Sequence, residues 1–585
     1  MKKTKIVATI GPASWDKEIL KQLFYEGVNV CRLNFSHGTQ EEHKKHIEII
    51  KEVREDLNLP IGIMIDTKGP EIRLGTFEHG LEVTLKPGDI FTFTTEEIIG
   101  TKEIVSVSYS YLPYDVKAGD RILVDDGLVE LEVIEINGNE IKCEAKNEGV
   151  LKDHKGMNVP GIKTRLPSLT DKDKEDILFG VREDVDFIAA SFIRKKEDIL
   201  KIRKILEDAG NFDIQIIAKI ENQEGVENMD EIIAVADGIM VARGDLGVEI
   251  ETEAIPLVQK ELIRKSVEHA KPVITATQML DSMMRNPRPT RAEVTDVANA
   301  IFDGTSAIML SGETASGKYP VEAVRTMKQI ALKTESALSY EELLEKRSQE
   351  ISNTTTNSIG KSTCFIAKEL DAKAIITATS SGYTSRAISK FKPKAPIIAA
   401  TTSQKVLRQL SLDWGVYGIL APYSATTDSV ISVSIEEAKK EGFIKEGDLV
   451  VLTAGLPVGL SGTTNLIKVH TIAKTIGKGM GIGDKSAVGR ACVVRNSEEL
   501  VEKFHDGDIL VIYNTSQGMI PYVERASGII SVEGGLTSSA AIVGLNMEKP
   551  TIVGVDKALD LIPHGEMITM DSSTGQIYSG QVDVK

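Results

Sequence analysis

Cysteine is scarce in this 585-residue chain, and the few cysteines lie far apart. They are Cys31, Cys143, Cys364 and Cys492, and no two of them form a CxxC pair. Disulfide-stapled domains and structural zinc sites both need closely spaced sets of cysteines, so we expect neither. Scattered cysteines are typical of proteins in a reducing compartment, which indicates the cytoplasm.

The sequence also lacks an excess of basic charge and any long apolar run. It has 69 Lys and Arg against 86 Asp and Glu, a net charge of -17. Sequence-independent binding to nucleic acid needs a basic surface, so we expect no nucleic-acid partner, although a local pocket for small anions is compatible with this charge. The apolar run from Ile6 to Ile10 ends at Gly11-Pro12, too short for a signal peptide or a membrane span. We therefore expect small-molecule substrates and no membrane partner.

Short apolar runs recur along the first half of the chain and indicate its fold. A chain of this length exceeds what one core organises, so several domains are expected. The runs are KIVATIG, VNVCRLNF, IGIMIDT, VDFIAASF, QIIAKIEN, GIMVARGD, PVITATQM and AIMLSGE. Their apolar character is continuous, which is typical of parallel strands covered on both faces. Strands alternating with helical patterns predict an α/β protein with a closed (β/α)8 barrel of the TIM type.

The clearest helical pattern covers residues 290–303. Thr290 and Glu293 form a capping box at its start. The apolar face is expected to consist of Val294, Val297, Ala298 and Ile301.

The barrel is expected to be interrupted by an inserted domain. Residues 1–70 and 167–335 hold the eight runs, whereas residues 71–166 alternate apolar and polar side chains. An Asn-Gly-Asn sequence at 137–139 is a hairpin signal. We expect an all-β domain that leaves from a βα loop and lies over the barrel mouth as a lid.

Two further domains are expected after the barrel. A charged helix at 341–350 begins an α/β domain, residues 336–474, with the strands AKAIITAT, APIIAATT and DLVVLTAG. A last domain, residues 475–585, contains the runs DILVIYN and PTIVGV. We interpret the glycine-rich residues 477–483 as a linker.

Charged side chains gather where the expected barrel strands end. Side chains two residues apart share one face of a strand, so Lys219 and Glu221 point together. Strand-end charges can simply be solvated or paired with one another, but a barrel filled by apolar side chains cannot hold so many unpaired charges cheaply. Glu221 and Asp245 suit Mg²⁺ or Mn²⁺, which take one or two carboxylates plus water and substrate oxygens. Arg32, Arg73 and Lys219 supply cations for phosphate oxygens, so the cluster predicts phosphoryl chemistry.

Several long motifs resemble pyruvate kinase. They are RLNFSHG (32–38), DTKGPEIR (66–73), KIENQEG (219–225), MVARGDLG (240–247), ATQML (276–280), NPRPTRAE (286–293) and MLSGETA (309–315). The likeness extends from Lys2 to about Val469. It implies transfer of the phosphoryl group of phosphoenolpyruvate to ADP, giving pyruvate and ATP, on a (β/α)8 barrel with a mobile lid. It also implies a homotetramer.

The resemblance implies roles for individual residues. Lys219 and Thr277 would be catalytic, Lys219 by neutralising the phosphoryl group in flight and Thr277 by bordering the path along which the enolate receives its proton. The implied substrate-binding residues are Arg32, Lys219, Gly244, Asp245 and Thr277, and the implied ligands of Mg²⁺ or Mn²⁺ are Glu221 and Asp245. The implied K⁺ ligands are Asn34, Ser36, Asp66 and Thr67, and Glu71 matches family members that need potassium. The implied nucleotide-binding residues are Asn34, His37, Arg73 and Lys155.

A loop in the α/β domain resembles an effector site. It consists of Thr379, Ser380, Ser381, Gly382, Tyr383 and Thr384. Hydroxyl and N–H groups at a strand-to-helix turn can bind an anion, although ordinary capped turns share this composition. In pyruvate kinases the matching loop binds the phosphate of an activating metabolite, and a second loop, here 455–464, faces it. Tyr383 stands where animal enzymes carry a basic residue, so a sugar monophosphate or AMP is favoured over fructose 1,6-bisphosphate. Arg386 and Lys390 would add positive charge.

The last domain resembles the swivelling phosphohistidine domain of phosphoenolpyruvate synthases and pyruvate phosphate dikinases. The likeness is carried by GGLTSSAAIVG (534–544) and by DSSTGQIYSG near the end. Those enzymes carry a catalytic histidine where this chain has Ser539. Serine cannot form the labile phosphoramidate with which histidine relays phosphate, so we expect no transfer here. Packing, stability or anchoring of the effector domain are alternative roles.

Three other functions are less compatible with these motifs. Aldolase-like and lyase barrels also use a Glu and Asp pair on a metal, but DTKGPEIR and the lid argue against them. A phosphoenolpyruvate synthase would need the missing histidine and an ATP-grasp domain, for which the sequence offers no candidate. A non-catalytic sensor would be expected to have lost Lys219, Glu221 or Asp245, and all three are present.

Overall fold

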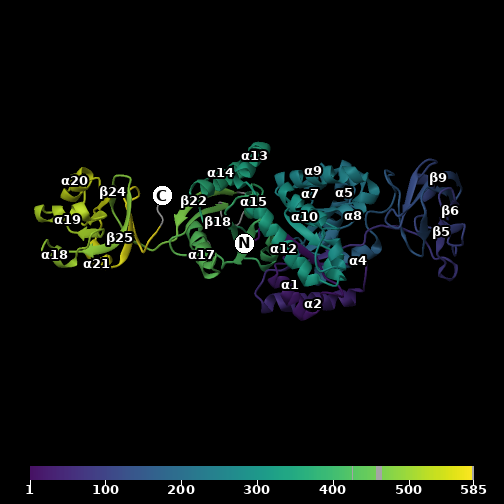
Figure 1. Ribbon diagram of the computed structural model, residues 1–585, viewed down its shortest axis with the longest axis horizontal. Helices are drawn as coiled ribbons and strands as arrows, with labels where there is room; N and C mark the ends of the chain where they lie inside the picture. The colour runs from purple at the N-terminus through teal and green to yellow at the C-terminus, as the bar shows by residue number, and fades with distance from the viewer. Residues whose placement is uncertain (425, 456–463, 583–585) are drawn as a thin grey trace. The chain divides into compact units, whose positions relative to one another are not determined.

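The computed structural model in Figure 1 describes residues 1–424, 426–455 and 464–582. Backbone contacts divide the chain into two units. The first comprises Met1–Ser352, Ser380–Lys392 and Thr401–Leu420, and the second comprises Asn353–Thr379, Pro393–Ala400 and Ala421–Lys585. Each unit is described by itself below.

The first unit is built on a closed barrel of parallel strands, as the apolar runs predict. The strand order around the barrel is β1-β17-β16-β15-β14-β13-β3-β2, and the pairings are parallel. The strands are β1 (Lys5–Thr9), β2 (Val30–Asn34), β3 (Gly62–Asp66), β13 (Phe187–Ala190), β14 (Gln215–Ile220), β15 (Gly238–Ala242), β16 (Val273–Ala276) and β17 (Ala307–Leu310). Their residues are almost all buried, which confirms that both faces are covered.

Helices follow the barrel strands in the sequence. They are α1 (Lys17–Tyr25), α2 (Gln40–Asp56), α4 (Asp171–Arg182), α5 (Lys196–Asp208), α6 (Gln223–Glu227), α7 (Met229–Val235), α8 (Arg243–Glu249), α9 (Ile255–Glu268), α10 (Arg291–Asp303), α11 (Gly312–Ala315) and α12 (Pro320–Ser336). The capping box of Thr290 and Glu293 starts α10 as predicted. The predicted apolar face of α10 is wrong at Val294, which is 37% exposed, because Ala300 faces the core together with Val297 and Ile301.

Alternate residues of each barrel strand enter two different cores. Val7, Met64 and Ile217 belong to one cluster inside the barrel. Ile6 and Ala8, the neighbours of Val7, belong to a larger cluster that also includes the buried residues of the surrounding helices. The residues of each strand that point into the barrel are therefore apolar along most of the strand. They become polar or charged only where the strand ends.

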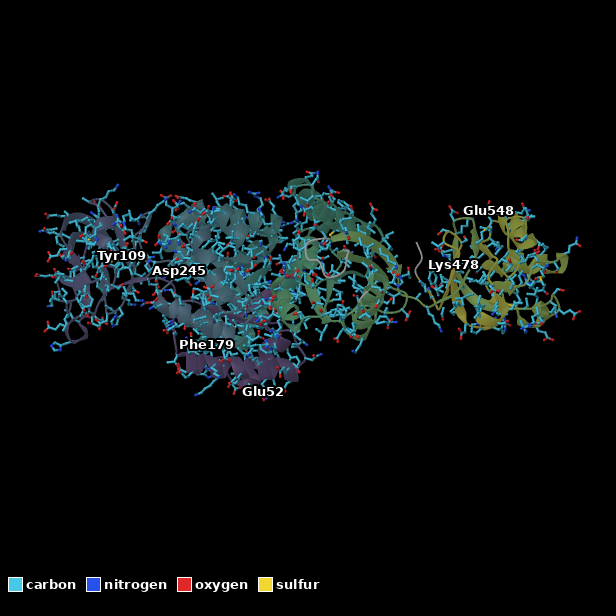
Figure 2. All side chains as sticks on the ribbon, turned by 180° about the vertical axis from the view of Figure 1, so that it is seen from behind. Glu52, Tyr109, Phe179, Asp245, Lys478 and Glu548 are labelled. Carbon is cyan, nitrogen blue, oxygen red and sulfur yellow. The ribbon has the colours of Figure 1, made fainter. Side chains whose placement is uncertain are left out.

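The inserted segment forms the predicted all-β lid. A seven-stranded sheet has the order β4-β12-β8-β9-β10-β6-β7, and β11 pairs with β5. The elements are β4 (Ile72–Arg73), β5 (Val83–Leu85), β6 (Ile90–Thr94), β7 (Ile104–Ser106), α3 (Leu112–Asp115), β8 (Arg121–Val124), β9 (Val129–Asn137), β10 (Glu140–Ala145), β11 (Gly149–Leu151) and β12 (Gly156–Asn158). The predicted turn at 137–139 joins β9 to β10, with Gly138 at φ 61°. Figure 2 labels Tyr109 in the lid, Phe179 and Glu52 on barrel helices, and Asp245 near the barrel end that meets the lid.

The remaining elements of the first unit follow the barrel. They are α13 (Tyr340–Glu350), α15 (Tyr383–Ser389), α16 (Gln404–Gln409) and β20 (Val416–Leu420). Short 3-10 turns occur at Glu78–Gly80, Thr252–Ala254, Asp281–Met284 and Leu410–Leu412. The helix predicted at 341–350 is thus confirmed as α13.

The second unit contains the three strands predicted for the α/β domain. Strand β18 (Ala374–Ala378) lies between β19 (Ile397–Thr401) and β21 (Leu449–Gly455) in parallel pairings, and β22 (Thr464–Thr471) pairs antiparallel with β21. The helices α14 (Thr355–Glu369) and α17 (Thr427–Lys440) belong to the same unit.

The end of the chain forms a separate eight-stranded mixed sheet with the order β23-β30-β29-β25-β26-β27-β28-β24. Its elements are β23 (Thr475–Lys478), β24 (Met480–Ile482), β25 (Ser486–Val493), α18 (Glu499–Lys503), β26 (Ile509–Ile512), a 3-10 turn (Gln517–Met519), α19 (Ile520–Arg525), β27 (Gly528–Ser531), α20 (Ser539–Asn546), β28 (Thr551–Val553), α21 (Ala558–Leu561), β29 (Met567–Asp571) and β30 (Gln576–Ser579). Lys478 and Glu548 mark it in Figure 2. The linker interpretation of residues 477–483 is wrong, because β23 and β24 pair with β30 and β28. Glycines let these strands pack closely: a Cβ on Gly481 would lie 1.7 Å from the carbonyl oxygen of Ser572.

The four cysteines are buried free thiols. Within the described part of the chain, no helix has the length and apolarity needed to cross a bilayer.

Candidate active site

Polar and charged side chains continue the inward rows of the barrel strands at their carboxyl ends. On β14 the inward row runs from Ile217 to Lys219 and then to Glu221, just past the strand. On β2 and β3 the corresponding residues are Arg32 and Asp66, which are 9% and 1% exposed. These side chains from neighbouring strands therefore meet at one end of the barrel.

Lys219 is the centre of this cluster. Its Nζ lies 3.1 Å from Asp66 Oδ1, 2.9 Å from Glu221 Oε1 and 2.8 Å from Ser191 Oγ. Burial lowers the pKa of Lys219, but the carboxylates of Asp66 and Glu221 outweigh burial and the net shift is upward. The ammonium group is therefore charged at neutral pH and is held in place from several sides.

Arg32 lies beside the same carboxylate. Its Nε donates to Asp66 Oδ2 at 2.6 Å, and its NH1 group donates to Thr9 Oγ1 at 3.0 Å. Burial raises the pKa of Asp66, but Arg32 and Lys219 outweigh burial and hold it below its ordinary value. Two cations thus share the Asp66 carboxylate, and Lys219 is also paired with Glu221, so both cations are held in place at the barrel mouth.

Glu221 has an unused acceptor position in a buried place. Its Oε2 accepts a hydrogen bond from the Phe192 N–H at 2.6 Å. Its Oε1 is buried and, despite the short approach of Lys219, has no hydrogen bond of acceptable geometry. Burial raises the pKa of Glu221 to about 7, with Lys219 opposing the shift and Asp245 adding to it. A buried carboxylate with one oxygen free of hydrogen bonds, beside a second carboxylate, fits a divalent cation.

Asp245 lies in the first turn of α8, directly after β15. No group of three or more His, Cys, Asp and Glu side chains in the described ranges is placed to hold a metal. A divalent ion at Glu221 and Asp245 would therefore need other oxygen ligands, as Mg²⁺ commonly takes from water and substrate phosphates.

Thr277 has a strained backbone next to this helix. Its φ is 67°, an uncommon value for a β-branched residue. The Gly244 N–H donates to Thr277 Oγ1 at 2.8 Å, and the Arg243 guanidinium donates to the Thr277 carbonyl at 2.7 Å. Arg243 is in turn paired with Asp296 at 2.7 Å. These contacts fix the hydroxyl of Thr277 close to Gly244.

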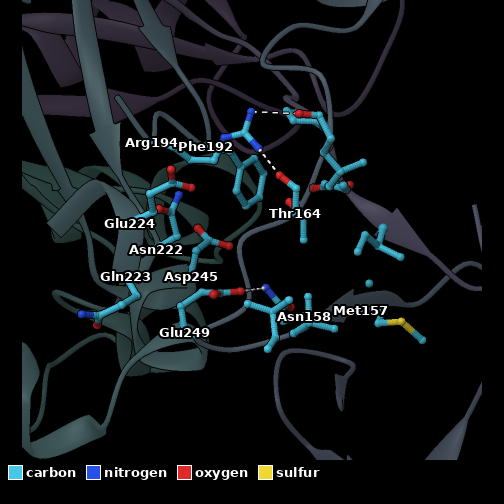
Figure 3. A pocket seen from close by; sticks show the side chains of 18 of the residues that line it. Met157, Asn158, Thr164, Phe192, Arg194, Asn222, Gln223, Glu224, Asp245 and Glu249 are labelled. Atoms are coloured by element: carbon cyan, nitrogen blue, oxygen red, sulfur yellow. Dashed lines mark hydrogen bonds between the residues drawn. The ribbon is translucent and has the colours of Figure 1, made fainter. Parts of the chain in front are cut away.

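A cavity of about 310 Å³ lies between lid and barrel (Figure 3). The barrel contributes Asp245, Glu249 and Asn222, and the lid contributes Arg73 and Lys155. Arg73 is paired with Glu71, its Nε lying 2.7 Å from Glu71 Oε2, and Lys155 is paired with Asp125 at 2.8 Å. Arg32, Lys219, Glu221 and Thr277 are not among the lining residues.

His37 and Asn34 lie away from that cavity. The His37 side chain is exposed, and its carbonyl accepts a hydrogen bond from His43 Nε2 at 2.8 Å. Asn34 is paired in register with Asp66, and its Oδ1 accepts from the Ser36 N–H at 3.1 Å. The structure thus brings Arg73 and Lys155, the two lid residues predicted for the nucleotide, to one cavity, but not Asn34, which ends β2, or His37.

Asn34, Ser36, Asp66 and Thr67 occupy the ends of two paired strands. Thr67 is 2% exposed, and its hydroxyl accepts from the Ser191 N–H at 3.2 Å. The four residues offer oxygen atoms from neighbouring positions.

The effector-loop residues are divided between the two units. In the second unit the Thr379 N–H donates to the Ala400 carbonyl at 2.9 Å. In the first unit Gly382, at φ 79°, precedes α15, and Arg386 donates to the Ser381 carbonyl at 2.9 Å. Lys390 Nζ donates to the Glu268 carbonyl at 3.5 Å. Most of the second loop, residues 456–463, lies outside the described residues.

Two residues that contact Lys219 or Arg32 are not among the residues predicted from the sequence. Ser191 contacts both Lys219 and Asp66, and Thr9 accepts a hydrogen bond from Arg32. Both continue an inward row, Ser191 two residues after Ala189 and Thr9 two residues after Val7. Because alternate residues of a strand point to the same side, this spacing could have predicted that both side chains point toward the barrel interior.

Ser539 begins α20 in the last sheet domain. Its Oγ accepts from the Thr515 N–H at 3.2 Å and lies 3.2 Å from the Thr515 carbonyl and 3.4 Å from Glu533 Oε2. The hydroxyl is therefore engaged locally.

Comparisons with known proteins agree along the whole chain. Residues 1–324 match the family described as pyruvate kinase, barrel domain, and residues 357–470 match pyruvate kinase, alpha/beta domain. Residues 504–575 match the family described as PEP-utilising enzyme, mobile domain.

Curated relatives and a solved structure extend this result. Pyruvate kinases from Geobacillus stearothermophilus and Bacillus licheniformis are 54% and 52% identical to this chain, with 100% of each chain covered. A crystal structure of a pyruvate kinase from Cryptosporidium parvum is 40% identical, with a TM-score of 0.77 over 80% of this chain and 96% of that one.

Proposed function

The chain belongs to the pyruvate kinase family and is a phosphotransferase, and from that premise we propose that it transfers the phosphoryl group of phosphoenolpyruvate to ADP. The observation that carries the proposal is the position of Lys219 Nζ, held between Asp66, Glu221 and Ser191 at the barrel mouth. Phosphoryl transfer needs positioned positive charge more than covalent participation by the protein, and this cluster supplies it.

Lys219 and Arg32 are the proposed phosphoryl-binding groups. The phosphoryl group carries negative charge on its oxygens throughout transfer. A protonated Lys219 would stabilise that charge as it moves from one oxygen to another, while Arg32 would grip the phosphate of the substrate. Asp66, which both cations share, and Glu221, which also pairs with Lys219, keep the two cations in place.

Glu221 and Asp245 are the proposed ligands of Mg²⁺ or Mn²⁺. The buried Glu221 Oε1 without a hydrogen bond supports this assignment. Such an ion, when bound, polarises substrate oxygens and offsets their charge. Gly244 and Asp245, at the start of α8, would also contact the substrate.

A monovalent ion is proposed beside this site. Asn34, Ser36, Asp66 and Thr67 present hard oxygens, which a weakly hydrated cation such as K⁺ accepts, and Glu71 agrees with a potassium requirement. Asp66 would then belong both to the ion and to the two cations of the phosphoryl site.

Thr277 is proposed to border the path by which the enolate receives its proton. The strained backbone of Thr277 and the hydrogen bond from the Gly244 N–H support a hydroxyl held in one orientation. Transfer to ADP leaves the enolate of pyruvate, which must take up a proton on carbon.

The nucleotide is proposed to bind in the cavity between lid and barrel. Arg73 and Lys155 line it together with Asp245, which supports their contact with phosphate oxygens. Asn34 and His37 do not line this cavity, and they belong to the proposed nucleotide-binding set only because they match the family motif.

We also propose how the protein is activated, how many copies of the chain assemble and where in the cell it is found. A sugar monophosphate or AMP would bind at Thr379, Ser380, Ser381, Gly382, Tyr383 and Thr384 and activate a cytoplasmic homotetramer. The last domain would be inactive in transfer, since Ser539 replaces the histidine and its hydroxyl is already hydrogen-bonded.

A coupled assay tests the proposed reaction. Pyruvate formation from phosphoenolpyruvate and ADP is measured with and without Mg²⁺ and with and without K⁺. We expect activity with both ions and its loss when either is omitted. Full activity in potassium- and sodium-free buffer would refute the monovalent site, and no pyruvate under any condition would refute the function.

A further inference from the structure

A hydrogen bond joins the lid to the metal-site helix. Asn158 Nδ2 donates to Glu249 Oε1 at 2.7 Å, drawn as a dashed line in Figure 3. Asn158 ends β12 of the lid, and Glu249 ends α8 of the barrel. The contact therefore bridges two parts of the chain that the cavity separates.

Asn158 and Glu249 each lie on the same strand or helix as, or next to, a residue proposed to bind the nucleotide or the metal. Glu249 lies four residues after Asp245, so both side chains face the same side of α8. Asn158 lies three residues after Lys155, and Gly156, the first residue of the same strand, is paired in register with Arg73. A shift of the Asn158–Glu249 bond would move Lys155 and Arg73 relative to Asp245.

The lid is fixed at its base by separate contacts. Where the chain leaves the barrel, the Gly69 N–H donates to Asp173 Oδ1 at 3.0 Å. Where it returns, Arg194 donates to the carbonyls of Thr164 and Leu166 at 3.2 and 2.9 Å. These contacts lie where the chain crosses between barrel and lid, so the position of the outer part of the lid depends on contacts farther out.

Among the described residues, the other contacts between the outer part of the lid and the barrel are weaker. A Cβ on Gly127, in the turn between β8 and β9, would lie 3.7 Å from Val248, so this turn comes close to α8. Lys163 and Glu227 form an ion pair at 3.9 Å with both side chains exposed, and such pairs contribute little. A charge-assisted hydrogen bond in a half-buried place is the stronger contact.

We propose that Asn158 and Glu249 are positioning residues whose hydrogen bond holds the lid over the metal site, so that Lys155 and Arg73 meet the phosphates of the nucleoside diphosphate. The inference rests on the proposed nucleotide site. It concerns the position of the lid and not the phosphoryl-transfer step, because neither side chain belongs to the cluster around Lys219.

The test uses a swap of the two side chains. In Asn158→Asp a carboxylate faces Glu249, so the bond is replaced by repulsion, and we expect the KM for ADP to rise about tenfold. In the double variant Asn158→Asp with Glu249→Gln, the glutamine amide can donate to the new aspartate. We expect the KM for ADP to return to within about threefold of that of the unaltered chain. The KM for phosphoenolpyruvate should change by less than about twofold throughout, because the proposed ligands Arg32 and Lys219 do not touch the lid.

Asn139→Asp is the matched control. Asn139 Nδ2 lies 3.3 Å from Glu96 Oε1 within the lid, so the same substitution faces a glutamate without involving the barrel. It should leave both KM values unchanged. Should Asn158→Asp fail to fold, Glu249→Ala removes the same bond, and hydrogen exchange at residues 156–158 should then be faster than in the unaltered chain.

Three results would overturn the proposal. They are an unchanged KM for ADP in Asn158→Asp, a double variant as impaired as the single one, and equal rises in both KM values. A failure of the nucleotide assignment is recognised separately, because Lys155→Ala would then leave the KM for ADP unchanged.

Discussion

The two ends of the barrel bury carboxylates in opposite ways. At the amino-terminal end, Asp186 is fully buried, and its oxygens accept hydrogen bonds from Arg408 Nε at 2.8 Å and from the Ile63 N–H at 2.9 Å. At the carboxyl end, Glu221 is 1% exposed, and its Oε1 lies 2.9 Å from Lys219 Nζ but accepts no hydrogen bond of acceptable geometry. A buried charge satisfied by the protein stabilises the fold, whereas a buried charge left incomplete is available to a ligand.

Lys219→Met tests the carboxyl end most severely. Removing a positioned charge from the phosphoryl site should lower kcat by about 10³-fold while changing the KM for phosphoenolpyruvate little. Thermal stability should also fall, because the buried carboxylates of Asp66 and Glu221 lose a positive partner. Lys204→Met, an exposed position on α5, is the control measured in the same coupled assay. Near-normal turnover in Lys219→Met would end the assignment.

Asp186→Asn tests the amino-terminal end. Loss of the carboxylate leaves Arg408 and Arg54 without their buried partner, which should cost about 3 kcal/mol of barrel stability. Turnover of the folded protein at 25 °C should stay within about twofold. Asp184→Asn is a matched control, because Asp184 pairs with Arg408 at 2.9 Å but is 61% exposed, and it should cost less than about 1 kcal/mol. A large loss of turnover without loss of stability would contradict the contrast between the two ends.

Glu221→Gln asks whether the incomplete carboxylate serves a divalent ion. We expect the Mg²⁺ concentration for half-maximal activity to rise about 10- to 100-fold, and direct Mn²⁺ binding to weaken by a similar factor. Glu197→Gln, exposed on α5, should change neither quantity. Unchanged Mn²⁺ binding in Glu221→Gln would assign the ion to other residues.

Asp413→Asn is expected to have the smallest effect, and its sign depends on pH. Burial raises the pKa of Asp413 to about 6, against the opposing effect of Arg386 and Lys5. The folded protein therefore binds a proton that the unfolded chain has released, and the group destabilises the fold increasingly as pH rises from about 4 to 6. The variant should be more stable than the unaltered chain by on the order of 2 kcal/mol at pH 7.5, and similar at pH 4. Calorimetry at both values checks this, and a variant less stable at pH 7.5 would show that the carboxylate is satisfied.

Much of the barrel could be predicted from the sequence because its signals are local. A continuously apolar strand such as Ile216–Ile220 is readable from neighbouring residues, and so is the capping box of Thr290. Two predictions made from the sequence were wrong, and each has a physical explanation. Val294 fits a helical period, but only packing showed that Ala300 takes its place in the core. The glycines at 477–483 suggested a linker, whereas they allow close strand packing.

The sequence by itself determined the barrel, the inserted lid and the inward row that carries Lys219 and Glu221, because the period of two along a strand is a property of the backbone. Only the tertiary structure decided which charge meets which partner. Ser191 and Thr9 join Lys219 and Arg32 across large separations in sequence, and Asn158 meets Glu249 across a cavity. The residues alone could not assign these contacts, because hydrogen bonds depend on distances that exist only once the strands have closed into a barrel.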